Sequence, residues 1–335
     1  MNINAVEYYL PEERLTNEQI SQENPEWSIE KIASKTGIIS RPIASEGMTS
    51  SDLAYCAANK LIEENNIEKE QIDFLLFCTQ SPDYFLPTSA CILQERLKLP
   101  KSIGALDYNL GCSGYVYGLS LAKSLIVSKM ACNVLLLTGE TYSKFINKKD
   151  KSCRSLFGDG ASATLVSNDS GIASIKDFCF GTDGEGAENL IVKHGGFRHR
   201  PIDGYDIEGD NQEYIRNDNF LYMNGNEIFK FTSKVIPELI NETIKKNELR
   251  IEDIDLFIFH QANKYMLDFI RKILNIAKER FYIYLENVGN TVSSTIPIAI
   301  KNAAGEGRIK RGNNILIAGF GVGYSYGATV LKYNN

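Results

Sequence analysis

The sequence lacks the features that mark membrane, secreted and metal-binding proteins. Its longest apolar runs, such as residues 134–137, fall well short of the roughly 18 residues that a membrane-spanning helix needs. The first residues include Glu7, Glu12 and Glu13 and no basic stretch followed by an apolar one, so we expect no signal peptide. The seven cysteines are odd in number and show no CxxC spacing, which argues against a disulfide framework and a zinc site and favours the reducing cytoplasm.

Histidine is scarce, and positive charge is not in excess. The 335 residues include only three histidines, at 194, 199 and 260, so a reaction that needs imidazole has few candidates. Thirty-six Lys and Arg against 42 Asp and Glu give a net charge of −6, which provides no overall basic footprint for nucleic acid. Hydrophobic residues make up 43% of the chain and charged residues 23%, as in globular proteins. At about 150 residues per domain, the length predicts two domains.

The chain contains one internal repeat. Residues 67–78 resemble residues 249–260, and each copy follows an amphipathic helical pattern and ends in a short apolar run typical of a buried strand. Three further pairs follow in the same order: 110–112 with 288–290, 133–139 with 314–319, and 160–166 with 327–331. Four ordered matches favour duplication over chance similarity. The sequence therefore predicts a duplicated α/β fold with an N-terminal half over residues 1–170 and a C-terminal half over residues 171–335.

Alternating strands and helices predict mostly buried, parallel-rich sheets with helices packed on both faces. The region from 183 to 219 fits neither half, because it is rich in Gly, Asp, Asn and Arg and shows little periodicity. We interpret it as a long loop or cap outside the core, of the kind that often has a function. His194 and His199 lie in this region beside Arg198 and Arg200, and we expect both to be solvated.

Cys112 has the sequence context of a nucleophile. It ends an apolar segment at Gly111 and precedes a predicted helix that begins near Gly114, and the two glycines permit a close approach of the backbone. A sulfur at a helix N-terminus meets free N–H groups and the positive end of the helix dipole, which favour the thiolate. The other cysteines are predicted to be inert packing residues: Cys56, Cys78, Cys91, Cys132, Cys153 and Cys179.

Two further residues are expected to join Cys112. The repeat places Asn290 where the first half has Cys112, at the end of a predicted strand over 281–285, and His260 closes the predicted strand over 255–259. Because α/β folds build their sites at the carboxyl ends of strands, the three side chains should converge into a site for acyl thioester chemistry. The glycine-rich run 319–327 lacks the Lys-Ser/Thr of a phosphate-binding loop, so we expect it to offer backbone N–H donors to an oxyanion.

These motifs together resemble the β-ketoacyl-[acyl-carrier-protein] synthase III family of the thiolase-like superfamily. The segments that carry the resemblance occur in family order at 107–114, 157–161, 223–227, 260–263, 287–291 and 319–323. The resemblance implies two related halves stacked as αβαβα layers in a homodimer. It also implies that Cys112, His260 and Asn290 are catalytic and that the backbone N–H groups of Cys112 and Val322 form the oxyanion hole.

The same resemblance implies a reaction without a metal or redox cofactor. Cys112 would take an acyl group from a thioester primer, and malonyl-[acyl-carrier-protein] would lose carbon dioxide and condense with it to a 3-oxoacyl product. Leu86 is implied to shape the acyl pocket across the dimer interface. The family's carrier-docking helix usually bears an arginine where this chain has Tyr265. The candidate docking residues for the acyl carrier protein are Gln261, Lys264, Arg271 and Lys272.

The identity and delivery of the primer stay open at this point. The family's adenine-stacking tryptophan falls at Lys31 here, and Trp27 is displaced from that position, so the primer could arrive on coenzyme A or on a carrier protein. Two same-fold functions remain as alternatives: acyl transfer to an oxygen or nitrogen nucleophile, and a non-catalytic carrier-binding scaffold. The complete Cys/His/Asn set argues against the scaffold. A cysteine hydrolase is disfavoured because the family shields its acyl-enzyme in a narrow tunnel.

Overall fold

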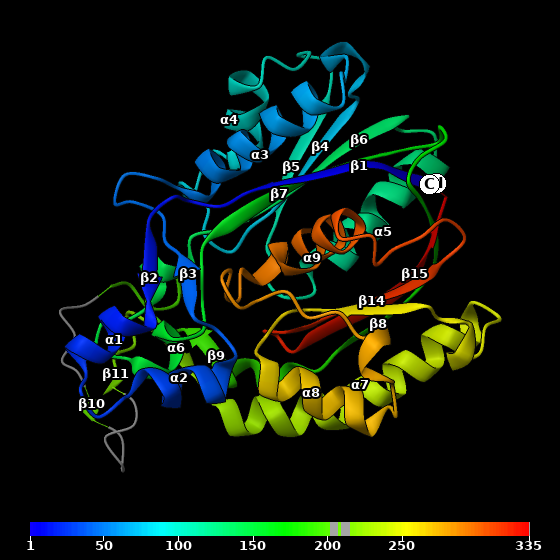
Figure 1. The fold of residues 1–335 in the computed structure, drawn as a ribbon. Coiled ribbons are helices and arrows are strands. Elements are labelled where there is room, and N and C mark those ends of the chain that lie inside the picture. The colour runs from blue at the N-terminus through cyan, green and yellow to red at the C-terminus, as the bar shows by residue number, and fades with distance from the viewer. Residues whose placement is uncertain (202–206, 209–214, 335) are drawn as a thin grey trace.

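Helices and strands alternate along the chain in the computed structural model, which describes residues 1–201, 207–208 and 215–334 (Figure 1). The strands of the large sheet are β1 (Asn2–Tyr9), β4 (Phe74–Cys78), β5 (Gly104–Tyr108), β6 (Asn133–Glu140), β7 (Gly160–Ser167), β8 (Ala173–Thr182), β13 (Leu256–Phe259), β14 (Asn314–Gly321) and β15 (Ser325–Tyr333). The short strands are β2 (Arg14–Thr16), β3 (Ser40–Pro42), β9 (Leu190–Val192), β10 (Ile207–Glu208), β11 (Ile215–Arg216) and β12 (Leu221–Met223).

The helices connect these strands. The α-helices are α1 (Asn17–Glu23), α2 (Ile29–Thr36), α3 (Ser50–Glu64), α4 (Ser89–Arg96), α5 (Gly114–Val127), α6 (Lys151–Arg154), α7 (Gly225–Lys246), α8 (Lys264–Ile273) and α9 (Thr295–Gly305). The 3₁₀ turns are η1 (Lys69–Gln71), η2 (Tyr142–Phe145), η3 (Gly184–Asn189), η4 (Ile251–Asp253), η5 (Lys278–Arg280) and η6 (Val292–Ser294). No helix among the described residues is both long and apolar enough to cross a bilayer.

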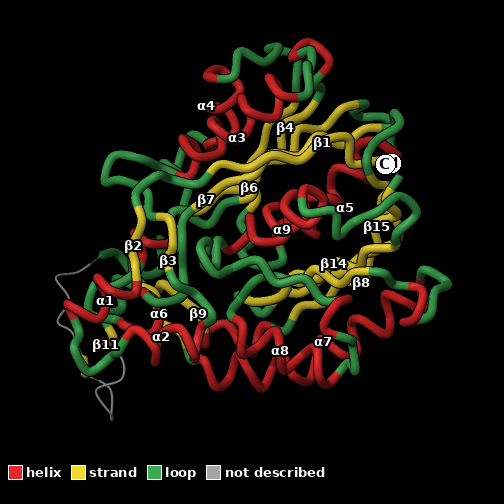
Figure 2. The backbone as a smooth tube through the Cα atoms, viewed as in Figure 1, coloured by secondary structure: helices red, strands yellow, loops and turns green. Residues whose placement is uncertain are grey.

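The elements stack as αβαβα layers. In Figures 1 and 2, α3 and α4 cover one face of the sheet region formed by β1, β4, β6 and β7, and α5 and α9 lie on its other face. Below them lies the region formed by β8, β14 and β15, whose outer face is covered by α7 and α8. The two central helices are therefore enclosed by sheet on both sides, and the predicted layered α/β fold is confirmed.

The sheet itself shows the duplication. In the first half β4 pairs parallel with β5 and β6, β6 pairs antiparallel with β7, and β7 pairs antiparallel with β1. In the second half β13 pairs parallel with β14, β14 antiparallel with β15, and β15 antiparallel with β8. Strands β4, β6, β7 and β1 thus correspond to β13, β14, β15 and β8. The predicted boundary near residue 170 lies in the turn between β7 and β8.

Three sequence predictions need correction. The large sheet is not parallel-rich, because three of its eight strand pairs are parallel and five are antiparallel. The predicted strand over 281–285 is wrong: only Phe281 forms a parallel bridge, to Phe257, and the Gln261 side chain accepts the N–H of Tyr284 at 2.7 Å in place of a strand partner. The region 183–219 is more ordered than a loop, because it includes η3 and β9, and β9 pairs antiparallel with β12. Residues 202–206 and 209–214 of that region lie outside the described residues.

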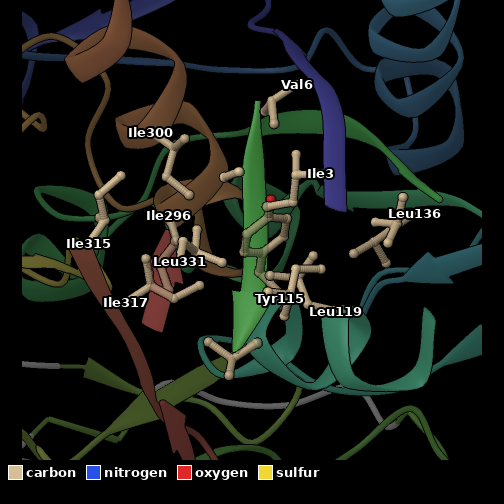
Figure 3. Packing of buried hydrophobic residues seen from close by; sticks show 14 of the residues in the cluster. Ile3, Val6, Tyr115, Leu119, Leu136, Ile296, Ile300, Ile315, Ile317 and Leu331 are labelled. Atoms are coloured by element: carbon tan, nitrogen blue, oxygen red, sulfur yellow. The ribbon is translucent and has the colours of Figure 1, made fainter. Parts of the chain in front are cut away.

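The central helices are held by apolar contacts on every side. The α5 sequence GYVYGLSLAKSLIV and the α9 sequence TIPIAIKNAAG are apolar almost all round, as expected for helices between two sheets. Figure 3 shows side chains of both helices interleaved with side chains of the strands. Burial of this surface stabilises the fold by about 25 cal/mol per Å². It also fixes the start of α5, which directly follows Cys112.

Gly114 marks the closest contact between α5 and β4. A Cβ atom at Gly114 would lie 2.3 Å from the Sγ of Cys78. The Cys78 thiol is fully buried and donates to the Leu110 carbonyl at 3.0 Å. This confirms Cys78 as a packing residue, whereas Cys91 and Cys132 are exposed and were wrongly predicted to be packed.

We expect Gly114→Ala to lower the free energy of unfolding by about 1–3 kcal/mol, because the added methyl group overpacks the contact with Cys78. Denaturant unfolding followed by circular dichroism measures this change. In a Cys78→Ala background the same substitution should recover much of the loss. Equal losses in both backgrounds would show that the contact with Cys78 is not the cause.

Candidate active site

Cys112, His260 and Asn290 line one cavity of about 290 Å³, although they lie far apart in the sequence. Cys112 lies between β5 and α5, His260 directly follows β13, and Asn290 precedes η6 and α9. All three are nearly buried, with 6%, 2% and 4% of their surface exposed. The structure therefore brings together the three residues predicted from the repeat.

Cys112 lies directly against the backbone of β14, which comes from the other half of the chain. A Cβ atom at Gly321 would lie 2.6 Å from the Sγ of Cys112, and one at Gly319 would lie 2.7 Å from the Cys112 carbonyl oxygen. No side chain fits at either position. Val322 follows at the end of the strand, and its side chain would lie 2.6 Å from a Cβ atom at Gly111. The absence of side chains at Gly319 and Gly321 therefore allows Cys112 to lie close to the backbone of β14 and of Val322.

His260 is held in one orientation. Its backbone N–H donates to the Ala318 carbonyl at 2.8 Å, and its Nδ1 lies 2.8 Å from the hydroxyl of Thr295, which also bonds the Val292 carbonyl at 3.0 Å. If the hydroxyl donates to the Val292 carbonyl, it accepts a hydrogen bond from the Nδ1–H group, and Nε2 is then unprotonated and can accept a hydrogen bond. If the hydroxyl turns to donate to Nδ1, Nε2 carries the proton. Thr295 is thus compatible with both tautomers.

Asn290 presents hydrogen-bond donors to the cavity. Its Oδ1 accepts the N–H of Val292 at 2.9 Å, which assigns the orientation of the amide and leaves its N–H groups available to a ligand. Its backbone N–H donates to the Leu156 carbonyl, and its carbonyl accepts the N–H of Gly158. The backbone and the side chain of Asn290 are therefore both fixed by hydrogen bonds.

The resting nucleophile is a thiol and not the predicted thiolate. Burial raises the pKa of Cys112 to about 12, and this effect outweighs the hydrogen bond from the Val322 backbone that lowers it. Burial also lowers the pKa of His260 to about 3, so the imidazole is neutral near pH 7. The helix N-terminus does not offset the effect of burial on the pKa of Cys112. The site at rest therefore holds a neutral thiol beside a neutral imidazole, without stored charge.

Proteins of a known family are similar to this chain over nearly its whole length. A family model described as 3-oxoacyl-[acyl-carrier-protein (ACP)] synthase III matches residues 106–184, and the model of its C-terminal part matches residues 244–333. A β-ketoacyl-[acyl-carrier-protein] synthase III of Clostridium perfringens is 39% identical over 324 residues, which cover 97% of this chain and 96% of that one. The chain belongs to the β-ketoacyl-[acyl-carrier-protein] synthase III family.

Further members of the synthase III family agree in sequence and in structure. The enzyme of that name from Fusobacterium nucleatum is 35% identical over 338 residues, 99% of this chain and 98% of that one. A solved 3-oxoacyl-(acyl-carrier-protein) synthase III superposes with a TM-score of 0.96 at 47% identity, with 99% of each chain covered. The β-ketoacyl-[acyl-carrier-protein] synthase III of Thermus thermophilus superposes with a TM-score of 0.89 at 34% identity, over 100% of this chain and 99% of that one.

The synthase III cavity continues outward into a second cavity of about 740 Å³. Both cavities are lined by residues from the ends of β12, α7 and α8 and from the segment after α6: Leu156, Met223, Gly225, Asn226, Asn263 and Tyr265. Trp27 lines the outer cavity together with Lys35, although the family's adenine-stacking tryptophan corresponds to position 31 and not to Trp27. The Nζ atoms of Lys31 and Lys35 each lie 5.8 Å from the centre of its ring. The two cavities therefore lie side by side and share a wall.

The candidate docking residues differ in their surroundings. Lys272 is exposed, and Lys264 is exposed but forms an ion pair with Asp268. Arg271 also lies beside Asp268, at 3.7 Å, and donates to the Ile276 carbonyl. Of these residues, Lys272 is therefore the most accessible cation on α8 for an acidic partner.

The docking role predicted for Gln261 is wrong. Gln261 is only 1% exposed, and its side chain donates to the Phe259 carbonyl at 2.6 Å and accepts the N–H of Tyr284 at 2.7 Å. It therefore braces the strand end that carries His260 and has no surface for a carrier protein. The histidines of the 183–219 region also differ from each other. His199 is exposed as predicted, whereas His194 is half-buried, with Nδ1 3.2 Å from the Asn219 side-chain oxygen.

Glu140 is a buried residue beside the site that the sequence reasoning missed. It ends β6, and its carboxyl group accepts hydrogen bonds from the Gln80 N–H at 3.1 Å, the Ser81 hydroxyl at 3.0 Å and the Ser293 hydroxyl at 3.3 Å. Burial raises the pKa of Glu140 to about 8. The signal was a charged residue at the end of an apolar strand, one position after Gly139. Because Ser293 belongs to η6, this carboxyl group connects the two halves near Asn290.

Glu140 should make the protein less stable as the pH rises from 6.5 to 8. The folded protein holds a proton on Glu140 up to about pH 8, whereas the unfolded chain releases it near the ordinary glutamate pKa of 4.5. Stability therefore falls with pH between these values, by roughly 1–2 kcal/mol over the upper part of the window. Glu140→Gln keeps a neutral hydrogen-bonding group and should remove this fall.

Denaturant unfolding at several pH values tests the role of Glu140. The range from pH 6.5 to 8 lies above the pKa of Asp159, which burial raises to about 6. It also lies above the pH range in which His260 makes stability depend on pH. Glu279→Gln, at an exposed position, is the matched control and should follow the wild type. Parallel profiles for the wild type and Glu140→Gln would contradict the expectation.

Proposed function

We propose that this protein catalyses the decarboxylative condensation of an acyl thioester primer with malonyl-[acyl-carrier-protein]. The observation that carries the proposal is the meeting of Cys112, His260 and Asn290 in one cavity. Membership of the synthase III family and the names of its relatives support it. They do not favour acyl transfer to oxygen or nitrogen, or a silent scaffold.

The first half-reaction loads the primer. The Cys112 thiol passes its proton to Nε2 of His260 as the sulfur attacks the thioester carbonyl. The backbone N–H groups of Cys112 and Val322 stabilise the oxyanion of the tetrahedral intermediate. The carbon–sulfur bond to the carrier breaks, and the leaving thiolate takes the proton back from His260. An acyl group is left on Cys112.

The second half-reaction forms the carbon–carbon bond. Malonyl thioester binds with its carbonyl oxygen near the Asn290 amide and Nε2 of His260, which donates in the tautomer that Thr295 stabilises from Nδ1. Loss of carbon dioxide moves an electron pair into the enolate, and the two donors stabilise the charge on its oxygen. The carbanion then attacks the acyl carbonyl, expels the Cys112 thiolate and gives the 3-oxoacyl product, and the thiolate takes a proton from solvent to return to the resting thiol. Decarboxylation drives this step, so no metal or redox cofactor is needed.

The partners follow from the same chemistry. Coenzyme A and acyl carrier protein both present a thioester on a long flexible arm, and the outer cavity is the natural route for that arm. Lys272, with Lys264 and Arg271 beside it on α8, would attract an acidic carrier protein. We also propose a homodimer in which Leu86 of one subunit reaches the acyl pocket of the other. Tyr84, Phe85 and Leu86 are 62%, 68% and 80% exposed in the single chain, which supports an apolar interface there.

Asn290→Ala should separate the two half-reactions. Acylation needs the Cys112 sulfur and backbone donors, which survive the substitution, so its rate should change only a few-fold. Decarboxylation loses one donor to the enolate oxygen and should slow by about 10²–10³. Intact mass spectrometry of the acyl-enzyme and release of carbon dioxide from malonyl-carrier measure the two steps.

The same assay tests Cys112 as the acylated residue. Cys112→Ser should lose stoichiometric acylation, and acyl label on another cysteine in that variant would refute the assignment. If Asn290→Ala slows both half-reactions by the same factor, Asn290 only holds the site together and has no special role toward the enolate.

Leu86→Glu should weaken the dimer. A stable dimer of this kind buries more than roughly 2,000 Å² of surface, and a charge within an apolar interface is not tolerated. Sedimentation equilibrium at micromolar concentration should give a dimer for the wild type and a monomer for Leu86→Glu. Met130→Glu alters an equally apolar side chain that is 67% exposed and should remain dimeric. A fully active wild-type monomer would contradict the proposal.

A further inference from the structure

A chain of hydrogen bonds connects the side chains of Asn290 and His260. The Oδ1 of Asn290 accepts the N–H of Val292 at 2.9 Å, and the Val292 carbonyl lies 3.0 Å from the hydroxyl oxygen of Thr295. The same hydroxyl oxygen lies 2.8 Å from Nδ1 of His260. All four residues are buried, with at most 4% of their surface exposed. The two side chains that the proposed function places at the enolate oxygen are therefore connected through one short segment.

Val292 has a constrained backbone in the middle of this chain. Its φ angle is 54°, in the left-handed region that a β-branched residue rarely adopts. Its N–H is bonded to the Asn290 side chain, and its own side chain is fully buried in the cluster that contains Cys112. A backbone conformation of this kind persists only where its surroundings hold it. The Val292 carbonyl therefore has a fixed position beside Thr295.

The Thr295 hydroxyl has one hydrogen and two neighbours that can accept it. When it donates to the Val292 carbonyl, Nδ1 of His260 carries the ring proton and Nε2 is an acceptor. When it donates to Nδ1, the ring proton is on Nε2, which can then donate. The two acceptors lie at similar distances, 3.0 and 2.8 Å, so both arrangements are accessible. Exchange between them releases one ring proton to water and takes one up at the other nitrogen, so the charge of the ring is unchanged.

Thr295 is the only hydrogen-bond donor placed against Nδ1 of His260 within the described residues. Burial lowers the pKa of His260 to about 3, and the Val292 backbone opposes this effect as a hydrogen-bond acceptor. A carbonyl cannot donate, and the Val292 N–H is already bonded to Asn290. Without the Thr295 hydroxyl, the ring proton would therefore stay on Nδ1, bonded to the Val292 carbonyl, and Nε2 would carry none.

We propose that Thr295 is a positioning residue for the second half-reaction, whose hydroxyl donates to Nδ1 of His260 and so keeps a proton on Nε2 for the enolate oxygen. This inference rests on the proposed function. Because Nδ1 faces Thr295, Nε2 is the ring nitrogen left for the cavity that His260 lines. The first half-reaction needs Nε2 as an acceptor, and the other orientation of the same hydroxyl provides it. Rotation of one hydroxyl between two acceptors thus lets one histidine act as a base and as a donor.

Thr295→Val removes the hydroxyl and keeps the size and branching of the side chain. Acylation of Cys112 should change only a few-fold, because Nε2 can still accept a proton. Release of carbon dioxide from malonyl-[acyl-carrier-protein] by the acylated enzyme should slow by about 10²–10³, because one donor to the enolate oxygen is lost. Thr295→Ser restores the hydroxyl and should return both rates to within a few-fold of the wild type. Intact mass spectrometry follows acylation, with the thioester that loads the wild type fastest among acetyl- to octanoyl-pantetheine as the probe.

Nitrogen-15 NMR observes the tautomer of His260 directly. The chain has only three histidines, and loss of signals in His260→Gln identifies those of His260. Because the pKa of His260 is about 3, the ring is neutral near pH 7, and the shifts of its two nitrogens report which one carries the proton. The wild type and Thr295→Ser should hold the proton on Nε2 in a measurable fraction of molecules, whereas Thr295→Val should hold it on Nδ1 alone. A hydroxyl that only supported packing would not change this spectrum.

Thr291→Val is the matched control. Thr291 lies next to Asn290 and is fully buried, and its hydroxyl has no hydrogen-bond partner among the described residues. The substitution removes a buried hydroxyl from the same segment without touching the His260 ring. It should leave the tautomer and the rates of both half-reactions unchanged, and an effect as large as that of Thr295→Val would refute the proposal.

The remaining outcomes separate this inference from the proposed function. If no thioester acylates the wild type, or if the acylated wild type releases no carbon dioxide from malonyl-[acyl-carrier-protein], the proposed function fails. If the wild type performs both steps and Thr295→Val slows both by the same factor, or slows neither, the proposed function stands and the role of Thr295 is refuted. If Thr295→Val does not fold, the wild-type spectrum still decides, because a proton on Nδ1 alone overturns the proposal.

Discussion

Cys112 is pressed against a strip of β14 that carries no side chains, and this contact joins the two halves of the molecule. The positions of Gly319 and Gly321 leave less than 3 Å between a hypothetical Cβ atom and Cys112, so the halves can approach this closely only with glycine there. The same approach brings the Val322 backbone to the thiol and places His260, one strand away on β13, at the same cavity. The site thus depends on the packing of one half against the other.

Close packing also determines the charge state of the site. Burial raises the pKa of Cys112 and of Glu140 and lowers that of His260, so each group is held neutral near pH 7 for the same physical reason. In the proposed reaction, negative charge develops on the carbonyl oxygen of the bound substrate. The donors that would stabilise that charge are already in place, because Thr295 holds His260 and Val292 holds Asn290. A preorganised dry site suits a reaction that passes through an oxyanion and an enolate.

The sequence alone predicted the duplicated fold and the residues that meet in the cavity, because both follow from a repeat of strands. It could not predict contacts between side chains of different elements. The segment 281–285 was predicted as a strand from its apolar residues, but β13 ends at Phe259 and the Gln261 side chain takes the place of a strand partner. The family resemblance implied that Gln261 docks a carrier, and only its burial shows that it braces the site. Glu140 lies outside every motif.

The two halves carry different residues at equivalent positions near the site. The first half has Cys78 where the second has His260, and the small buried thiol leaves room for α5 to begin at Gly114, directly after the nucleophile. Similarly, Glu140 follows Gly139 where Phe320 follows Gly319. Phe320 lines the cavity and meets the His260 ring edge-on at 5.9 Å, whereas Glu140 is buried and holds the backbone of Gln80. The first half therefore carries the nucleophile Cys112, and the second half carries His260 and Asn290. A duplication therefore yields one site and not two, because each half keeps only the groups that the other lacks.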